Sequence, residues 1–246
     1  MSEKEKDPNS WFRNRFDFAL LQSVLSDLSH FVALERLGPK VTERIAWRAN
    51  IDEPKIALTF DDGPDPRFTP QLLKVLQEFE VRATFFLIGK HLEAHFDLAQ
   101  EIRDRGHEVG NHTFTHPLLP RLEDGQIVEE IARTDDLLKS LDGAQPRFLR
   151  PPMGLFSKRV LDLIQASGYK TVVGDVYPRD SHLPGKDKIV MRVLRRVING
   201  SIIILHDGGN SHNFDRSDTI AAVQKLIPKL RSRGFEFVTL SELLSD

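Results

Sequence analysis

Carboxylate and imidazole side chains occur in two short segments at spacings that suit a divalent metal. The sequence TFDDGPD, Thr59–Asp65, places Asp61 and Asp62 side by side after an apolar run. Later in the chain, NHTFTHP places His112 and His116 four residues apart. One carboxylate and two neutral imidazoles are a ligand set for Zn²⁺ that leaves positions open for water and substrate. The two segments together indicate a hydrolytic metal site.

Further groups suited to proton transfer follow these segments. Arg150 begins the sequence RPPMG, and His206 lies in the sequence LHD. If one aspartate and the two histidines bind the metal, the other aspartate, Arg150 and His206 remain available to move protons. This set predicts a metal-assisted acid–base hydrolysis.

Each pattern alone has a simpler explanation. Asp61–Gly63 by itself is typical of a turn with solvated acids. His91 and His95 repeat the four-residue spacing without paired aspartates nearby, and we interpret them as surface or core histidines. His116 differs because Pro117 follows it, which prevents a long helix through this histidine. We therefore expect His112 and His116 to lie in a turn at the end of a strand.

Composition limits the class of protein. The 246 residues fit one domain, and 40% apolar residues beside 28% charged residues predict a large core with a solvated surface. The net charge of −2 gives no electrostatic reason to expect a nucleic-acid partner. There is no cysteine, so metal ligands must come from His, Asp or Glu, and a reducing compartment is compatible.

Short apolar segments alternate with amphipathic ones from Lys55 onward. Several of the apolar segments are nearly continuous, as expected for strands buried on both faces. They are Lys55–Phe60, Val81–Ile88, His107–Asn111, Arg147–Leu149, Tyr169–Gly174, Ser201–Leu205 and Phe235–Leu240. Seven β/α steps predict a parallel barrel, with an open doubly wound sheet as the alternative. The candidate residues mostly follow strand ends, where the active sites of β/α barrels form.

Residues 1–54 are predicted to form a helical extension before a barrel domain at residues 55–246. Apolar residues recur at every fourth position from Phe16 to Val32, which favours a helix packed on the barrel. Membrane-surface binding is the alternative, but the polar face is not basic enough to favour it. We find no transmembrane segment and no signal peptide, and we expect a cytoplasmic protein.

The motifs, in their order, resemble those of the polysaccharide deacetylase family, which shares the NodB homology domain. The resemblance covers about Lys55 to Leu243. It implies a distorted (β/α)7 barrel and a metal-dependent hydrolase. The segments that carry the resemblance are Thr59–Gly63, His112–His116, Arg150–Gly154, Asp175–Asp180 and Ile204–Asp207.

The resemblance also implies roles at the metal. Asp62, His112 and His116 would bind a divalent ion, most often Zn²⁺, with Co²⁺ or Ni²⁺ as alternatives. Asp61 would be the general base that takes a proton from water, and Arg150 would keep it ionised and oriented.

Other roles implied by the resemblance concern the leaving group and the substrate. His206 would be the general acid, oriented by Asp180, with Asp175 as an alternative partner. The Met153 N–H would stabilise the oxyanion. Leu205 would contact the acyl methyl, and the substrate-binding set would also include Pro152 and Tyr177.

One departure from the family pattern concerns the substrate groove. The family usually has tryptophan after the second aspartate of the segment that corresponds to Asp175–Asp180. This chain has Ser181 there, followed by His182. An aromatic wall for sugar stacking is therefore missing there. We hypothesise that Tyr177 replaces it from another side.

The predicted function is removal of N-acetyl groups from amino-sugar glycans of the chitin-oligosaccharide or peptidoglycan type. One alternative is a deacylase or deformylase of a small or lipid-linked N-acyl amide with the same mechanism. Another is a non-catalytic carbohydrate-binding barrel. Asp61, Arg150 and His206 argue against the last, because binding alone requires none of them. The sequence does not indicate an oligomeric state.

Overall fold

The computed structural model describes residues 44–142, 146–209 and 214–245. The strands are β1 Ile45–Ala46, β2 Lys55–Asp61, β3 Thr84–Leu87, β4 Glu108–Asn111, β5 Phe148–Leu149, β6 Lys170–Val172, β7 Ile202–His206 and β8 Glu236–Phe237. The helices are α4 Thr69–Glu78, α5 Gly89–Ala94, α6 Phe96–Asp104, α7 Asp124–Asp142, α8 Lys158–Ala166, α9 Lys186–Arg196, α10 Ser217–Arg231 and α11 Leu240–Leu243. Short 3-10 helices are η1 Leu119–Arg121, η2 Pro152–Gly154 and η3 Asp180–His182.

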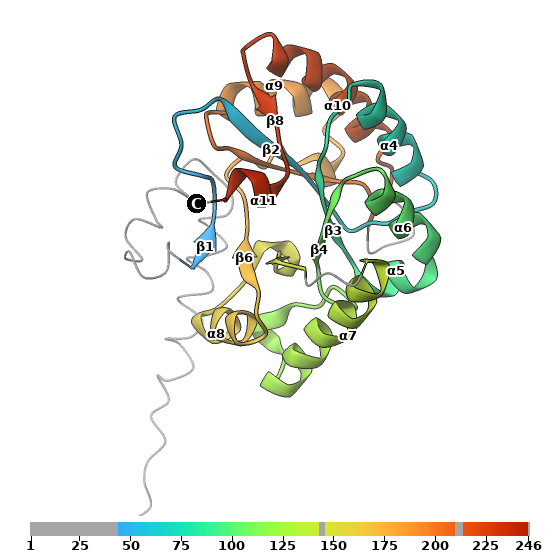
Figure 1. Cartoon of the computed structure of the whole chain (residues 1–246), viewed down its shortest axis with the longest axis vertical. Helices are drawn as coiled ribbons and strands as arrows, with labels where there is room; N and C mark the ends of the chain where they lie inside the picture. Colours follow the sequence, from blue (N-terminus) through green and yellow to red (C-terminus); the bar gives the residue numbers. More distant parts are fainter. Residues whose placement is uncertain (1–43, 143–145, 210–213, 246) are drawn as a thin grey trace, which may run out of the picture.

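All the paired strands are parallel, in the order β1-β6-β5-β4-β3-β2-β7, with β8 beside β2. Val176, beyond the end of β6, forms a parallel bridge with Ile203 of β7. This bridge joins the chain that follows β6 to β7, the strand at the far end of the order. Helices lie around the outside of the strands (Figure 1). Each predicted strand segment overlaps an observed strand, and the predicted distorted (β/α)7 barrel is confirmed.

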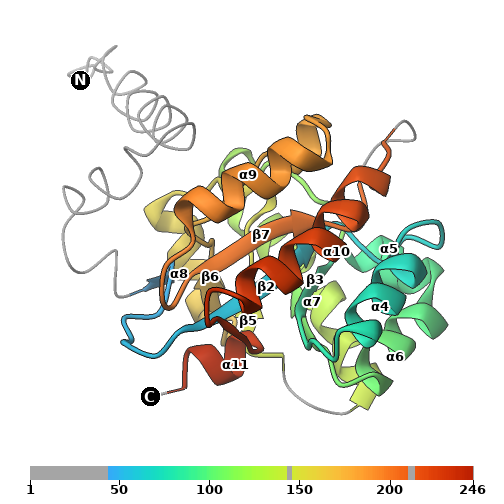
Figure 2. The same ribbon diagram turned by 90° about the horizontal axis from the view of Figure 1, so that it is seen from above.

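The apolar pattern explains the layers. Every residue of β2 after Lys55 is buried, as expected for a strand with the core on both faces. Helix α4 buries Leu72, Leu73, Val75 and Leu76, so its apolar stripe faces the sheet. Figure 2 shows α4, α9 and α10 outside the strands.

Two helices begin in different ways. Ser157 is the N-cap of α8 and accepts a hydrogen bond from the Val160 N–H. Thr69 is not a cap, because Phe68 occupies that position. The Thr69 hydroxyl instead accepts a hydrogen bond from the Asp65 N–H and donates one to Asp207.

Strand β1 lies in the segment that was assigned to the N-terminal extension. Ile45 and Ala46 pair with Thr171 and Val172 of β6, so the sheet includes part of this segment. The helix predicted between Phe16 and Val32 lies outside the described residues, and the boundary at residue 55 stays a prediction. No helix in the described ranges is both long and apolar enough to cross a membrane.

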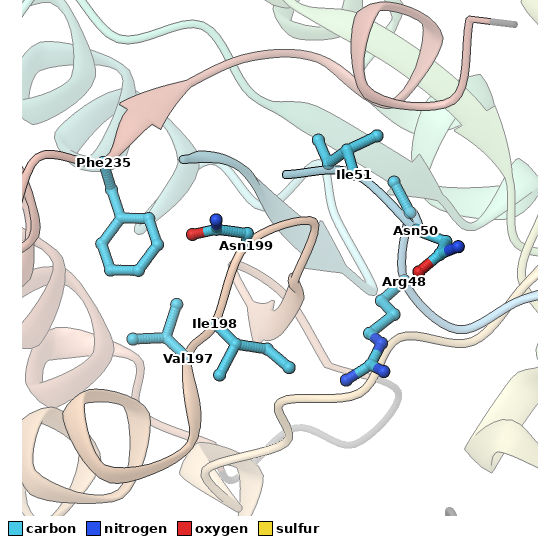
Figure 3. A pocket seen from close by; sticks show the side chains of 8 residues that line it. Arg48, Asn50, Ile51, Val197, Ile198, Asn199 and Phe235 are labelled. Carbon is cyan, nitrogen blue, oxygen red and sulfur yellow. The ribbon is translucent and has the colours of Figure 1, made fainter. Parts of the chain in front are cut away.

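A pocket of about 450 Å³ opens at the amino ends of β7 and β8. Figure 3 shows its lining side chains, among them Ile198, Asn199 and Phe235. These residues precede the two strands, whereas the predicted site residues follow strand ends. The pocket is therefore at the opposite end of the barrel from the site.

Candidate metal centre

Three side chains from two loops converge after the carboxyl ends of β2 and β4. The Asp62 Oδ1 atom lies 3.4 Å from His112 Nε2 and 3.3 Å from His116 Nε2. All three ligand atoms lie within 4.8 Å of one another. Ligands about 2.1 Å from a tetrahedral metal ion are separated by about 3.4 Å, so the spacing fits a zinc-sized ion. The structure brings together the triad that the sequence predicted.

Buried polar atoms in the triad also fit a cation. Among the described residues, Asp62 Oδ1 is buried without a hydrogen-bond donor. Burial raises the pKa of Asp62, but the close approach of His112 and the charges of His206, His112 and His116 outweigh it and hold the pKa below its usual value. A carboxylate that stays ionised while it is buried suits metal coordination.

The backbone at the triad is strained. Asp62, Thr113 and His116 have positive φ angles of 72°, 64° and 60°, in the left-handed region that favours glycine. Such non-glycine residues cost energy and cluster at functional sites. The strain indicates that these loops are shaped to direct side chains.

Arg150 contacts both Asp61, the predicted base, and His112, a predicted metal ligand. Its Nη1 donates to Asp61 Oδ1 at 2.6 Å and to the Thr59 hydroxyl at 2.8 Å. Its carbonyl oxygen accepts a hydrogen bond from His112 Nδ1 at 2.7 Å. This bond leaves the His112 Nε2 lone pair free for a metal, as is usual for histidine ligands. The Arg150 guanidinium also lies over the Phe86 ring, 4.1 Å from its centroid.

His206 and Asp180 form the second half of the site. His206 is paired with Asp61 in the β2–β7 register, so both lie at the same edge of the sheet. His206 Nδ1 lies 2.9 Å from Asp180 Oδ1, and Asp180 Oδ2 accepts bonds from the His206 N–H and the Thr219 hydroxyl. Burial lowers the pKa of His206, but the charge and hydrogen bond of Asp180, with Asp62 and Asp61, raise it to about 9.

Asp175, the alternative partner, lies elsewhere. Its carboxylate accepts hydrogen bonds from the Ser201 hydroxyl at 2.9 Å and the Ile202 N–H at 2.8 Å. It therefore caps the amino end of β7, and the structure places Asp180 at His206.

The predicted substrate-binding residues differ in accessibility. Met153 has a positive φ of 58° and is 58% exposed, whereas Pro152 beside it is buried. The Tyr177 ring is half-buried, with its centroid 6.1 Å from that of His206. Leu205 is fully buried in the largest core cluster and has no solvent-accessible surface. Its predicted contact with an acyl methyl stays a prediction.

Sequence reasoning missed two residues near the triad. Asp207, to which no role was assigned, is 1% exposed and accepts a hydrogen bond from the Thr69 hydroxyl at 2.5 Å. Burial, with the charges of Asp62 and Asp61, raises its pKa to about 7 despite that bond. His91 was interpreted as a surface or core histidine, but its Nδ1 lies 2.9 Å from the Asp62 carbonyl oxygen. Spacing carried no signal for either residue, because both contacts depend on how the loops fold.

Comparisons with known proteins agree with this geometry. A family model described as polysaccharide deacetylase matches residues 48–172. A peptidoglycan-N-acetylglucosamine deacetylase of Bacillus cereus is 38% identical over 213 residues, which cover 82% of this chain and 94% of the relative. A chitooligosaccharide deacetylase of Sinorhizobium fredii is 40% identical over 199 residues, covering 78% of this chain and 93% of the relative.

Solved structures show the same fold. A peptidoglycan N-acetylglucosamine deacetylase in complex with 4-naphthalen-1-yl-N-oxidanyl-benzamide superposes with a TM-score of 0.77 at 34% identity, covering 81% of this chain and 92% of that one. A pseudoenzyme from Bacillus anthracis superposes with a TM-score of 0.75 at 27% identity, covering 82% of this chain and 69% of that one. With the candidate metal triad and the barrel, these matches show that the chain belongs to the polysaccharide deacetylase family.

Proposed function

We propose that this chain is an active zinc-dependent hydrolase that removes N-acetyl groups from amino-sugar glycans of the peptidoglycan or chitin-oligosaccharide type. Family membership and the deacetylase activities in the names of the relatives support the substrate class. The observation that carries the proposal is that the loops after the carboxyl ends of the strands bring together a candidate metal triad, a carboxylate paired with arginine, and a histidine paired with aspartate.

The metal would be held by Asp62, His112 and His116. When bound, a divalent ion supplies Lewis-acid polarisation and lowers the pKa of a water ligand toward ~7. One carboxylate and two imidazoles suit Zn²⁺, and the same ligands accept Co²⁺ or Ni²⁺.

Asp61 would act as the general base. The carboxylate accepts the proton of the attacking water, while the Arg150 Nη1 bond to Oδ1 at 2.6 Å holds its orientation. Arg150 is 2% exposed, so the pair lies in a poorly solvated site where its orientation is well defined. The Met153 N–H would donate to the oxyanion that forms at the acetyl carbon.

His206 would act as the general acid. With a pKa raised to about 9, its imidazole is protonated near neutral pH and can give this proton to the leaving amine. Asp180 orients the ring through Nδ1, so Nε2 is the nitrogen that faces the site. Water therefore loses its proton to Asp61 and the amine gains one from His206.

Activity has to be separated from mere retention of the fold, because the relatives include a pseudoenzyme. The test is acetate release from chitooligosaccharides and peptidoglycan by protein of measured metal content, with Asp61→Asn as the control. Metal-dependent release by the wild type that Asp61→Asn lacks is expected. Bound metal without release from any N-acetylated substrate would refute the proposal.

A small N-acyl amide is a second candidate substrate. The position where the family usually has tryptophan holds Ser181, whose Oγ lies 2.5 Å from the Tyr177 hydroxyl. The side chain at this position therefore offers no aromatic face to a sugar. Turnover of small formyl or acetyl amides faster than that of oligosaccharides would favour this candidate.

A further inference from the structure

The two loops that carry the metal triad come from strands that are not neighbours. Asp62 follows β2, the two histidines follow β4, and β3 lies between those strands. The segment Ile88–His91 follows β3 directly and includes the first residues of α5. This segment contacts both loops.

Main-chain hydrogen bonds join this segment to each loop. Ile88 donates its N–H to the Gly63 carbonyl oxygen at 3.0 Å, in the aspartate loop. Gly89 donates to the Thr113 carbonyl oxygen at 2.9 Å, and Lys90 donates to that of Phe114 at 3.0 Å, both in the histidine loop. The N–H groups at the start of a helix have no partner inside it, so they are available for such bonds.

The start of α5 lies too close to the histidine loop for a side chain at position 89. A Cβ atom at Gly89 would lie 2.4 Å from Thr134 Oγ1 and 2.6 Å from a ring carbon of Phe114. Glycine therefore allows the start of α5 to pack directly against the histidine loop.

His91 adds the side-chain contact to the metal ligand itself. Its Nδ1 lies 2.9 Å from the Asp62 carbonyl oxygen, which can only accept, so Nδ1 carries the proton. The peptide that it holds belongs to a strained residue, since Asp62 has a φ of 72°. On another side Gly208 packs so closely that a Cβ atom there would lie 2.2 Å from the same oxygen. The Asp62 peptide is therefore restrained by both residues.

We propose that His91 is a positioning residue for the metal site. It does not bind the ion; its Nδ1–H bond fixes the left-handed Asp62 backbone and thereby aims the Asp62 carboxylate at the two imidazoles. The inference rests on the proposed function only in taking Asp62, His112 and His116 as the metal ligands. The role parallels that of the Arg150 carbonyl, which orients His112.

The experiment compares side chains of similar size with and without a donor at position 91. Zn²⁺ affinity is measured by competition with a chromogenic chelator for wild type, His91→Asn and His91→Leu. We expect His91→Leu to bind Zn²⁺ about 10- to 100-fold more weakly, the usual effect of losing a residue that orients a ligand. His91→Asn keeps a donor and should stay within about threefold of wild type.

His95 provides the matched control, because it lies four residues further along and is absent from the described metal cluster. His95→Ala should bind Zn²⁺ like wild type. Circular dichroism and melting of the metal-free proteins establish that the variants are folded, and His91→Ala serves as a second variant without a donor.

The outcomes separate the two proposals. If Asp62→Ala binds Zn²⁺ as tightly as wild type, the assignment of the triad fails. If Asp62→Ala loses Zn²⁺ while folded His91→Leu and His91→Ala keep wild-type affinity, the triad stands and the role of His91 is refuted. Equal weakening in His91→Asn and His91→Leu would also refute the role of the hydrogen bond.

Discussion

His206 faces a buried carboxylate: its Nδ1 atom lies 2.9 Å from Asp180 Oδ1. Burial raises the pKa of Asp180, but the charge of His206, its hydrogen bond, Arg216 and Thr219 hold the pKa below its ordinary value. The pair therefore stays ionic over a wide pH range. The pKa of His206 is raised above its unfolded value, so its contribution to stability is complete below about pH 6.5 and is lost as pH rises through about 9.

Asp180→Asn should move the alkaline limit of activity to lower pH. Without the carboxylate, burial dominates and the pKa of His206 falls, so the general acid loses its proton earlier as pH rises. We expect the rate at neutral pH to fall about 10- to 100-fold. The measurement is kcat/KM for acetate release against pH at fixed metal concentration, since bound cation itself lowers the pKa of His206. Asp215 is exposed and lies between β7 and α10, so Asp215→Asn should keep the wild-type pH profile.

Asp61→Asn should lose at least about a hundredfold in kcat while keeping the metal. The amide cannot accept a proton, but Asp62, His112 and His116 are unchanged. Acetate release and metal content are measured on the same preparation. Near wild-type turnover would rule out Asp61 as the base, and loss of the metal would make Asp61 a ligand instead.

Arg150→Met should separate the two contacts of Arg150. The guanidinium bond to Asp61 is lost, whereas the main-chain carbonyl that accepts from His112 remains. Activity should fall about a hundredfold with Zn²⁺ affinity within about threefold of wild type. The protein should also be less stable by about 3 kcal/mol, because Asp61 becomes a buried unpaired charge. Chemical denaturation and chelator competition measure the two effects.

Gly208→Ala should weaken metal binding although residue 208 is not a ligand. The added Cβ would lie 2.2 Å from the Asp62 carbonyl oxygen and 2.8 Å from the Gly63 nitrogen, so the aspartate loop has to move. We expect at least about a tenfold loss of Zn²⁺ affinity. Gly125→Ala in α7 is the control, since a Cβ there meets nothing within 4 Å. Equal affinities in both variants would show that the loop tolerates the displacement.

Zn²⁺ binding should persist into mildly acidic solution. Burial and the charge of His112 lower the pKa of His116 to about 4, despite the opposing charges of Asp62 and Asp61. This histidine is therefore neutral in the folded protein above that pH, and protons compete for it only as pH falls toward 4. Titration of Zn²⁺ affinity from pH 8 to 4 tests this. A loss centred near pH 6.5 would contradict the buried environment of His116.

The barrel was predictable because its signal is local. Residues such as Ile56 and Leu58 form continuous apolar runs, and Gly106 and Gly168 follow helices with φ angles of 78° and 85°, the left-handed conformation that ends a helix. Strand β1 was missed because two residues, Ile45 and Ala46, are too short to show a period.

The site was predictable only in part. Residue types and spacing predict one aspartate and two histidines at a metal, and the family resemblance selects Asp62, whereas the environments of His91 and Asp207 depend on how α5 and the loop after β7 pack against the aspartate loop. Those contacts join segments far apart in the chain, so no spacing rule identifies them.

The left-handed residues around the site have a consequence for engineering. Thr113, His116, Met153 and Arg179 each hold a conformation that glycine adopts at little cost. Selection for heat resistance alone would therefore favour glycine at several of these positions, and at His116 it would remove a proposed metal ligand. Directed evolution for thermal stability and directed evolution for turnover should therefore select different residues at these few positions.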